Sequence, residues 1–195
     1  MNTTPHDNQD GRKVWLSEDD VDLLLDAAKD TERRIAFALG CQCGLRSAEI
    51  LDVTPNDVVD TQAGHMLTVR HGKGDKYRET PIPNQLVTQI NTIDDYRDES
   101  SDQPIISVDG TNSLRYWIKT TREQLAEQTD DDRWNFVSMH DLRRTWATSL
   151  ASKDVDPLIV CDWGGWEDLD TFLDHYRGSY SPEAQARERA KVDWL

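Results

Sequence analysis

The sequence predicts an α+β fold in which helices predominate and one small antiparallel β-sheet lies on the flank of the helical body. Apolar residues recur at helical spacing along most of the chain, strand-forming residues are confined to two short neighbouring runs, and no segment is repeated. A chain of 195 residues can bury one substantial core. We therefore expect one domain over residues 14–195. Residues 1–13 are polar and without periodicity, so we expect a flexible arm or linker there.

The first half of the domain should contain three helices. Ser17 and Asp20 have the spacing of a capping box, and Leu24 and Leu25 follow at helical spacing. Gly44 supplies the expected C-terminal stop of the second helix. The helices predicted in this half cover residues 18–29, 31–43 and 46–51.

A β-hairpin should follow these helices. Residues 66–70 and 77–83 alternate or carry strand-forming side chains, and the glycines of HGKGDK lie between them as turn residues. The rest of the chain has mostly helical periodicity. The helices predicted there cover residues 84–97, 112–128, 139–152, 156–163, 168–177 and 182–191.

The composition excludes a membrane protein and a disulfide scaffold. The hydrophobic fraction is 36%, the mean hydropathy is −0.75, and no stretch approaches the ~18 apolar residues of a membrane span. The N-terminus has no hydrophobic signal core, so we expect a cytoplasmic protein. Cys41 and Cys43 lie too close for an ordinary bridge, and Cys161 is the third cysteine, so we predict reduced and buried thiols. The histidines and cysteines lack zinc-ligand spacing, so no structural metal is predicted.

The net charge of −15 opposes a nucleic-acid partner, because phosphate binding is driven by Lys and Arg. The acidic residues are spread over the whole chain, however, as in proteins from salt-loving organisms, and the Debye length is only about 3 Å at 1 M salt. The local charge at a site therefore matters more than the total. Two stretches are locally basic and supply the candidate DNA-binding residues Arg70, Lys76, Arg78 and Arg144.

Four short motifs carry side chains suited to chemistry on a phosphate. GLRSAEIL places Arg46 and Glu49 three residues apart on one helical face, and HGKGDK presents Lys73 at the hairpin turn. In SMHDLRRTWAT, a helix capped by its serine would carry His140 and Arg143 on one face.

The fourth motif, WGGWEDLDTFLDHYRGSY, supplies Trp166 after a glycine pair and Tyr176 at the end of a short helix. Singly, the four motifs have ordinary explanations as an ion pair, a charged turn, a histidine beside a basic turn and core aromatics. Their joint order and spacing resemble the tyrosine recombinase (phage integrase) family over roughly residues 15–191. The resemblance implies a mostly helical catalytic domain of the DNA breaking-rejoining type.

The resemblance implies a role for each motif residue. Arg46 and Arg143 match the two arginines that clamp the non-bridging oxygens of the scissile phosphate. Lys73 matches the lysine that protonates the departing 5′ oxygen. His140 matches the histidine that hydrogen-bonds the phosphate and can move the tyrosine proton. Trp166 occupies a position held by His or Trp, where an indole N–H can donate.

Tyr176 matches the nucleophile, and Glu49 matches an acidic support of the pocket. The implied activity is that of a site-specific DNA recombinase or integrase, which cleaves and rejoins DNA through a 3′-phosphotyrosyl intermediate. This chemistry requires no metal or nucleotide cofactor. The implied partners are double-stranded DNA and further copies of the chain, which assemble on DNA as a tetramer, and no membrane is involved.

The sequence departs from the family pattern between the tryptophan and the nucleophile, where the interval is one residue longer than usual. Tyr180 is therefore a rival to Tyr176. We favour Tyr176 because it follows the TFLD helix directly, whereas Tyr180 follows Gly178 and precedes Pro182.

Both ends of the chain leave alternatives open. The family's N-terminal DNA-binding domain has no counterpart here, so we expect either an excised fragment or a short stand-alone member. The C-terminal segment with Val192, Trp194 and Leu195 could dock on a neighbouring protomer, as in the family, or pack on its own domain.

Two other functions are compatible with the sequence. A catalytically silent DNA-binding or regulatory relative would keep the fold without the reaction. The acidic composition also allows an unrelated helical protein-interaction module. Convergence of the motif residues on one pocket would favour the enzyme.

Overall fold

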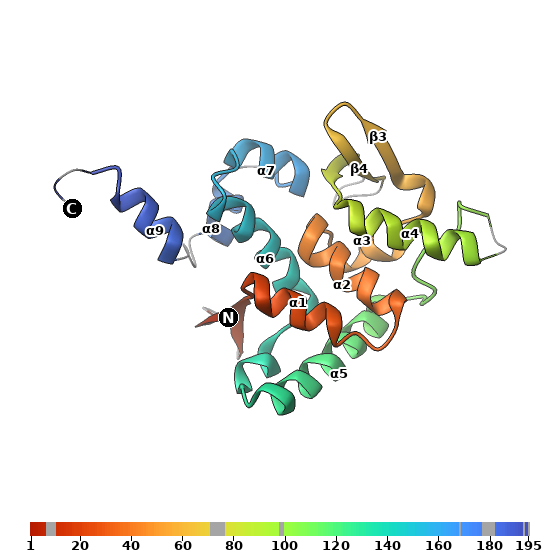
Figure 1. The fold of residues 1–195 in the computed structure, drawn as a ribbon, viewed down its shortest axis with the longest axis horizontal. Coiled ribbons are helices and arrows are strands. Elements are labelled where there is room, and N and C mark those ends of the chain that lie inside the picture. The colour runs from red at the N-terminus through yellow and green to blue at the C-terminus, as the bar shows by residue number, and fades with distance from the viewer. Residues whose placement is uncertain are drawn as a thin grey trace.

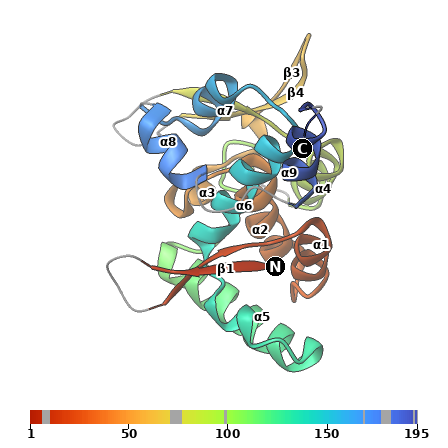
Figure 2. The ribbon, with the colours of Figure 1, turned by 90° about the vertical axis from the view of Figure 1, so that its left-hand side faces the viewer.

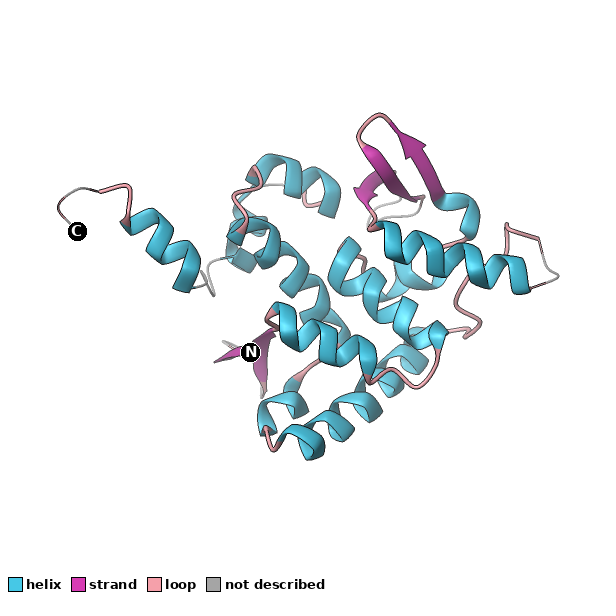
Figure 3. Cartoon of the chain, in the orientation of Figure 1, coloured by secondary structure: helices cyan, strands magenta, loops and turns pink. Residues whose placement is uncertain are grey.

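Helices form the body of the protein, and short strands form two separate antiparallel sheets at its periphery (Figure 3). The computed structural model describes residues 1–6, 11–70, 77–97, 100–167, 169–176, 182–192 and 194. The helices are α1 (Glu18–Asp26), α2 (Thr31–Cys43), α3 (Ser47–Asp52), α4 (Asn84–Tyr96), α5 (Thr111–Thr129), α6 (Met139–Ser152), α7 (Pro157–Gly164), α8 (Leu169–Tyr176) and α9 (Pro182–Arg189), with 3₁₀ turns η1 (Pro55–Asp57) and η2 (Asp132–Phe136). The strands are β1 (Asn2–Pro5), β2 (Arg12–Trp15), β3 (Val58–Thr61), β4 (Gly64–Val69) and β5 (Arg78–Pro81).

Helix α2 forms the centre of the helical body, with α1, α4, α5 and α6 packed against it (Figure 1). Asp30 caps its N-terminus by accepting a hydrogen bond from the Arg33 backbone N–H at 2.9 Å. Residues 35–39 are all buried, and a helix that is buried on every side needs neighbours all round. The helix ends at Gly44 in the left-handed region, with φ 71°, which confirms the predicted glycine stop.

The predicted helices are all present, with differences of up to three residues at their ends. The first helix has the predicted capping box between Ser17 and Asp20 but ends at Asp26 rather than at residue 29. Its early end follows from the next helix, because Asp30 must adopt an extended backbone to cap α2. The fold class predicted from the sequence is confirmed.

The larger sheet has the strand order β3-β4-β5 and contains the predicted hairpin. Leu67 of β4 lies opposite Thr80 of β5 in antiparallel register. The strand β3, which was not predicted, pairs with the other edge of β4, where Val58 lies opposite Leu67. Its four residues, VVDT, are too few to show a strand alternation in the sequence.

The N-terminal segment, for which a flexible arm or linker was expected, contains two short strands. Strands β1 and β2 pair antiparallel, and β2 lies against α6 (Figure 2). The Val14 backbone N–H donates to Asp141 Oδ1 at 3.0 Å, and the Leu16 N–H donates to Thr145 Oγ1 at 3.0 Å. These partners lie more than 120 residues away in sequence, so local composition could not predict the strand.

A second, smaller core joins α6, α7 and α8. Trp146, Val160 and Phe172 are buried in it, and Trp163 and Trp166 pack against it. This core places the C-terminal end of α7 beside α6, which is the helix predicted to carry two of the catalytic residues.

Helix α9 lies away from the main body in Figure 1. The Arg187 guanidinium of α9 donates to the Ser152 carbonyl and to Asp154, both at 2.8 Å, at the end of α6. Trp194 is exposed. None of the described helices is long and apolar enough to cross a bilayer.

The three cysteines are free and buried, as predicted. Burial raises the pKa of the Cys41 thiol to about 12 and also raises the pKa of the Cys43 thiol.

Candidate active site

Helix α6 begins at the predicted cap and carries Arg143 into the interior. Ser138 and Asp141 form the capping box, in which the Ser138 backbone N–H donates to Asp141 Oδ2 at 3.0 Å. His140 lies in the first turn, three residues before Arg143, so the two α-carbons share one side of the helix. Arg143 is only 3% exposed, whereas His140 is exposed.

The Arg143 guanidinium is held by the C-terminal ends of two helices. Its Nη1 donates to the Gly44 carbonyl at the end of α2, and its Nη2 donates to the Gly164 carbonyl at the end of α7, at 2.6 Å. Carbonyls at helix C-termini have no partner within the helix and carry partial negative charge, so a guanidinium is well placed there. Gly44 is required for this approach, because a Cβ there would lie 2.3 Å from the Trp146 ring.

Arg46 and Arg78 meet on the carboxylate of Glu49. Arg78 donates from Nη1 and Nη2 to the two Glu49 oxygens at 2.8 and 2.7 Å. Arg46 donates from Nη1 to Oε1 at 2.8 Å and from its backbone N–H to Oε2 at 2.7 Å, so Glu49 also caps α3. Glu49 and Arg78 are buried, while the Arg46 side chain is 27% exposed.

Three consecutive carbonyls at the end of α7 accept hydrogen bonds from these three arginines. The Trp163 carbonyl accepts from Arg78 Nε at 2.9 Å. The Gly164 carbonyl accepts from Arg143 Nη2, and the Gly165 carbonyl accepts from Arg46 Nη2 at 3.3 Å. The last turn of α7 therefore sets the spacing of three guanidinium groups that come from α3, β5 and α6.

The cluster contains three guanidinium groups and one carboxylate, so positive charge is in excess. Burial alone would raise the pKa of Glu49, but the hydrogen bonds and charges of Arg78 and Arg46 outweigh it and lower this pKa to about 2. Burial lowers the pKa of Arg143 to about 9, and the charges of Arg46 and Arg78 act in the same direction against the opposing charge of Glu49. An anion placed beside Arg46 and Arg143 would balance this excess.

Trp166 covers the Arg143 guanidinium with its ring face. The Arg143 Cζ lies 4.1 Å from the centre of the Trp166 ring, within the range of a cation–π interaction. The same ring stacks on Trp146, with centroids 6.1 Å apart, and meets Phe172 edge to face at 5.1 Å. The Trp166 ring is therefore packed between the aromatic residues of the smaller core and the predicted catalytic residue Arg143.

The structure brings together Arg46, Arg143 and Trp166 of the six predicted catalytic residues, with Glu49 as the predicted acidic support. Tyr176 is the last residue of α8, which packs against α6 and α7. Lys73, the DNA-binding candidate Lys76 and the rival nucleophile Tyr180 lie outside the described residues.

Two of the predicted DNA-binding residues are buried and have partners within the protein. Arg78 is 8% exposed and engages Glu49 and the Trp163 carbonyl. Arg144 is 6% exposed, pairs with Asp141 and lies over the Trp15 ring at 5.4 Å. The local basicity of the sequence did not indicate that both guanidinium groups lie in the interior.

The alternation of β5 could have revealed the buried position of Arg78. Arg78 and Thr80 are the buried residues of this strand, and Ile82 just beyond it is also buried, so the three share the inward period-two face. Arg70, in contrast, is exposed just after β4 and pairs with Asp57 at 2.6 Å. Arg70 therefore stays a candidate DNA contact. The carbonyl acceptors of the α7 turn had no signal in the side-chain pattern.

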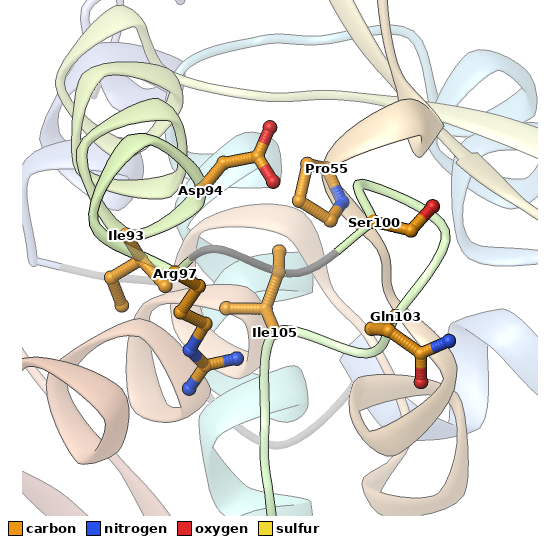
Figure 4. Close-up of a pocket in the computed structure, with 7 residues that line it drawn as sticks. All are labelled: Pro55, Ile93, Asp94, Arg97, Ser100, Gln103 and Ile105. Atoms are coloured by element: carbon orange, nitrogen blue, oxygen red, sulfur yellow. The ribbon is translucent and has the colours of Figure 1, made fainter.

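A small pocket elsewhere in the fold is separate from this cluster (Figure 4). It is lined by Pro55, Ile93, Asp94, Arg97, Ser100, Gln103 and Ile105. Asp94 accepts a hydrogen bond from Ser101 Oγ at 2.7 Å, and Arg97 donates to the Pro104 carbonyl at 3.2 Å. These polar groups have protein partners, so the pocket is not the better candidate. Among the described residues, no group of three or more His, Cys, Asp and Glu is arranged to hold a metal ion.

Comparison with known proteins shows the family to which the chain belongs. Residues 14–182 match the model of the phage integrase family. The chain is 30% identical over 181 residues to tyrosine recombinase XerA of Pyrococcus furiosus, which covers 91% of this chain and 62% of that protein.

Two solved structures share the fold. The crystal structure of XerA recombinase has a TM-score of 0.72 and 23% identity, over 91% of this chain and 64% of that one. XerH site-specific recombinase bound to palindromic difH substrate has a TM-score of 0.67 and 18% identity, over 92% of this chain and 52% of that one. The chain thus spans less than two thirds of the length of these relatives.

Proposed function

The chain belongs to the phage integrase family, and from this premise we propose that it cleaves and rejoins double-stranded DNA as a site-specific recombinase or integrase. The observation that carries the proposal is the excess of positive charge where Arg46 and Arg143 meet the turn at the end of α7. A phosphodiester is the anion that such a pair of guanidinium forks would clamp. Family membership removes the interpretation as an unrelated helical interaction module.

The proposed reaction exchanges one phosphodiester bond for another. The Tyr176 phenol oxygen attacks the phosphorus, the bond from phosphorus to the 5′ oxygen breaks, and a 3′-phosphotyrosyl bond forms. His140 takes the phenol proton, and Lys73 supplies a proton to the departing 5′ oxygen. Attack by a 5′ hydroxyl on the same phosphorus reverses these steps and rejoins the strand.

Arg46 and Arg143 contribute by stabilising the charge that grows on the non-bridging oxygens in the transition state. Their fixed partners favour this role, because preorganised donors need little rearrangement when the charge develops. Trp166 keeps the Arg143 guanidinium in place through its ring face, which supplements the indole N–H donation expected from the family resemblance.

The first prediction tests the nucleophile with nicked duplexes of randomised central sequence, in which the cleaved 5′ end diffuses away and traps the adduct. We expect the chain to form a covalent protein–DNA adduct that survives denaturation. Tyr176→Phe should abolish the adduct, because the attacking oxygen is absent, while Tyr180→Phe should retain it. Denaturing electrophoresis measures the adduct, and Tyr96→Phe, at an exposed position on α4, is the matched control.

The outcomes separate the remaining alternatives. Loss of the adduct with Tyr180→Phe and its retention with Tyr176→Phe would move the nucleophile to Tyr180. DNA binding without any adduct, in dilute buffer and in molar salt, would identify a catalytically silent DNA-binding or regulatory relative.

The proposal includes the partners of the reaction. Double-stranded DNA is the substrate, and the similarity to XerH bound to its difH substrate supports this choice. Strand exchange between two duplexes requires several active sites, so we propose that copies of the chain assemble on DNA as a tetramer. The reaction is placed in the cytoplasm.

A further inference from the structure

We propose that Arg78 is a positioning residue of the strand-transfer site, although the family resemblance gives it no reacting role. It holds Glu49, which in turn orients Arg46. It also ties β5 to the α7 turn that holds Arg143. This inference rests on the proposed function and replaces the direct DNA contact that the basic hairpin suggested.

All three guanidinium nitrogens of Arg78 donate hydrogen bonds. Nη1 and Nη2 reach the two Glu49 oxygens at 2.8 and 2.7 Å, and Nε reaches the Trp163 carbonyl at 2.9 Å. All three of these donors are engaged and the Arg78 charge is balanced by Glu49, so a DNA phosphate would have to displace a carboxylate that already has ideal partners.

Arg78 fixes the carboxylate on which Arg46 depends. Both Glu49 oxygens are shared, because each accepts from Arg78 and from one group of Arg46. Without Arg78, the carboxylate would be held from one side only and could follow the partly exposed Arg46 side chain. Arg46 would then lose the fixed orientation that a preorganised phosphate clamp requires.

Arg78 also determines where the α7 turn lies relative to the sheet. Its Nε donates to the Trp163 carbonyl, and Arg143 and Arg46 donate to the next two carbonyls of the same turn. Gly165, with φ 64°, packs on the Arg78 stem, where an added Cβ would lie 2.9 Å from Cδ. The turn and Arg78 therefore position each other.

Lysine distinguishes this role from a phosphate contact. A lysine ammonium keeps the positive charge but cannot reproduce three coplanar N–H directions toward two carboxylate oxygens and a carbonyl. A direct phosphate contact would tolerate Arg78→Lys, because lysine binds phosphate as a point charge. A positioning role would not tolerate it.

The test measures single-turnover adduct formation by the full chain on the nicked duplex pool over a range of protein concentrations. We expect Arg78→Lys to lower the maximal rate by about tenfold to a hundredfold. The protein concentration for half-saturation should change by less than about threefold, because the loss appears only in the transition state. Rates are corrected for the folded fraction measured by denaturant unfolding.

Combined variants show whether Arg78 acts through Arg46. Arg78→Lys with Arg46→Lys should be scarcely slower than Arg46→Lys alone, because residues that act as a unit are not additive. The matched control is Arg33→Lys. Arg33 also has a carboxylate partner, Asp30, but it lies at the N-terminal end of α2, whereas the cluster lies at the C-terminal end. This control should keep the wild-type rate.

Three results would overturn the inference. One is weaker DNA binding at an unchanged maximal rate, which would restore the direct contact. Another is a loss that disappears after correction for the folded fraction, which would make Arg78 purely structural. The third is full additivity with Arg46→Lys.

A spectroscopic measurement keeps the inference testable if the wild-type chain forms no adduct and the proposed function fails. In the ¹⁵N-labelled chain without DNA, the Arg46 Nε–H signal should exchange faster with water in Arg78→Lys than in wild type or Arg33→Lys. Gly165→Ala should have the same effect, because the added Cβ would press against the Arg78 side chain at Cδ. Unchanged Arg46 exchange in both variants would refute the positioning role even if the wild-type chain is active.

Discussion

Arg143 and Arg144 are adjacent on α6 and almost equally buried, yet only the charge of Arg144 is paired with a carboxylate in the described contacts. Arg144 pairs with the Asp141 carboxylate and lies over Trp15, so its charge is neutralised within the protein. Arg143 donates hydrogen bonds to two backbone carbonyls, and its neighbours include the arginines Arg46 and Arg78. A buried arginine that is paired with a carboxylate needs no further anion, whereas an arginine beside other cations can accept an external one.

The difference continues on the two sides of α6. The side with Asp141 and Thr145 binds the β2 strand through the Val14 and Leu16 backbone N–H groups. The side with Arg143 faces the ends of α2 and α7. One helix thus carries a structural face and a face that we assign to chemistry.

Substitution of Arg143 should have the largest effect on activity. Removing one fixed donor for the transition-state charge lowers rates by about 10²–10³-fold. We expect a loss of this size for Arg143→Leu in single-turnover adduct formation, because the phosphate loses one of its two guanidinium clamps. The free energy of unfolding should fall less than in Arg144→Leu. The Gly44 and Gly164 carbonyls lose a donor, but the repulsion by Arg46 and Arg78 is relieved and no carboxylate is left without its cation.

If Arg143→Leu loses activity only in proportion to its loss of folded protein, Arg143 has a structural role like that of Arg144. The adduct rate and the free energy of unfolding should therefore be measured on one preparation of the variant.

Substitution of Arg144 should reverse this pattern. Arg144→Leu leaves the Asp141 carboxylate buried without its cation, and breaking such a pair costs about 3 kcal/mol. We expect the free energy of unfolding to fall by this amount in denaturant titrations. The adduct rate of the folded fraction should stay within about twofold of wild type, because Arg144 makes no contact with the cluster. A hundredfold slower rate at unchanged stability would return Arg144 to the DNA-binding residues.

The contrast also shows what the sequence could predict. Caps and stops act within a few residues, so the starts of α1 and α6 and the glycine end of α2 were correctly predicted. The alternation of β5 places Arg78 on the inward face, but its partners Glu49 and Trp163 lie 29 and 85 residues away in sequence, so no local pattern could identify them. Arg143 likewise could not be distinguished from Arg144 by local sequence, because its partners Gly44 and Gly164 lie 99 and 21 residues away.

The candidate site was predictable as a set of residue types but not as a geometry. The order of motifs selected Arg46, Arg143 and Trp166, and the fold brings them together. The shared turn at the end of α7 is formed by backbone carbonyls, which leave no trace in the order of side chains.

The last prediction concerns Glu49, the carboxylate shared by Arg46 and Arg78. Its pKa is lowered from an ordinary value of 4.5 to about 2, so its stabilising contribution is present above about pH 4.5 and is lost as the pH falls toward 2. We expect the free energy of unfolding of wild type to fall over this window. Glu49→Gln should be less stable at neutral pH and should show a shallower fall in acid, because the titrating group is absent.

The measurement is denaturant unfolding from pH 7 down to pH 2, with Glu188→Gln as the control. Glu188 is exposed on α9 and pairs with Lys191, far from the arginine cluster, so its variant should follow the wild-type curve. Parallel acid curves for wild type and Glu49→Gln would mean that Glu49 gains no stability from its arginines. Glu49 would then not stabilise the charges of Arg46 and Arg78. These two arginines would no longer differ in this respect from Arg143, which among the contacts of the described residues does not bind this carboxylate.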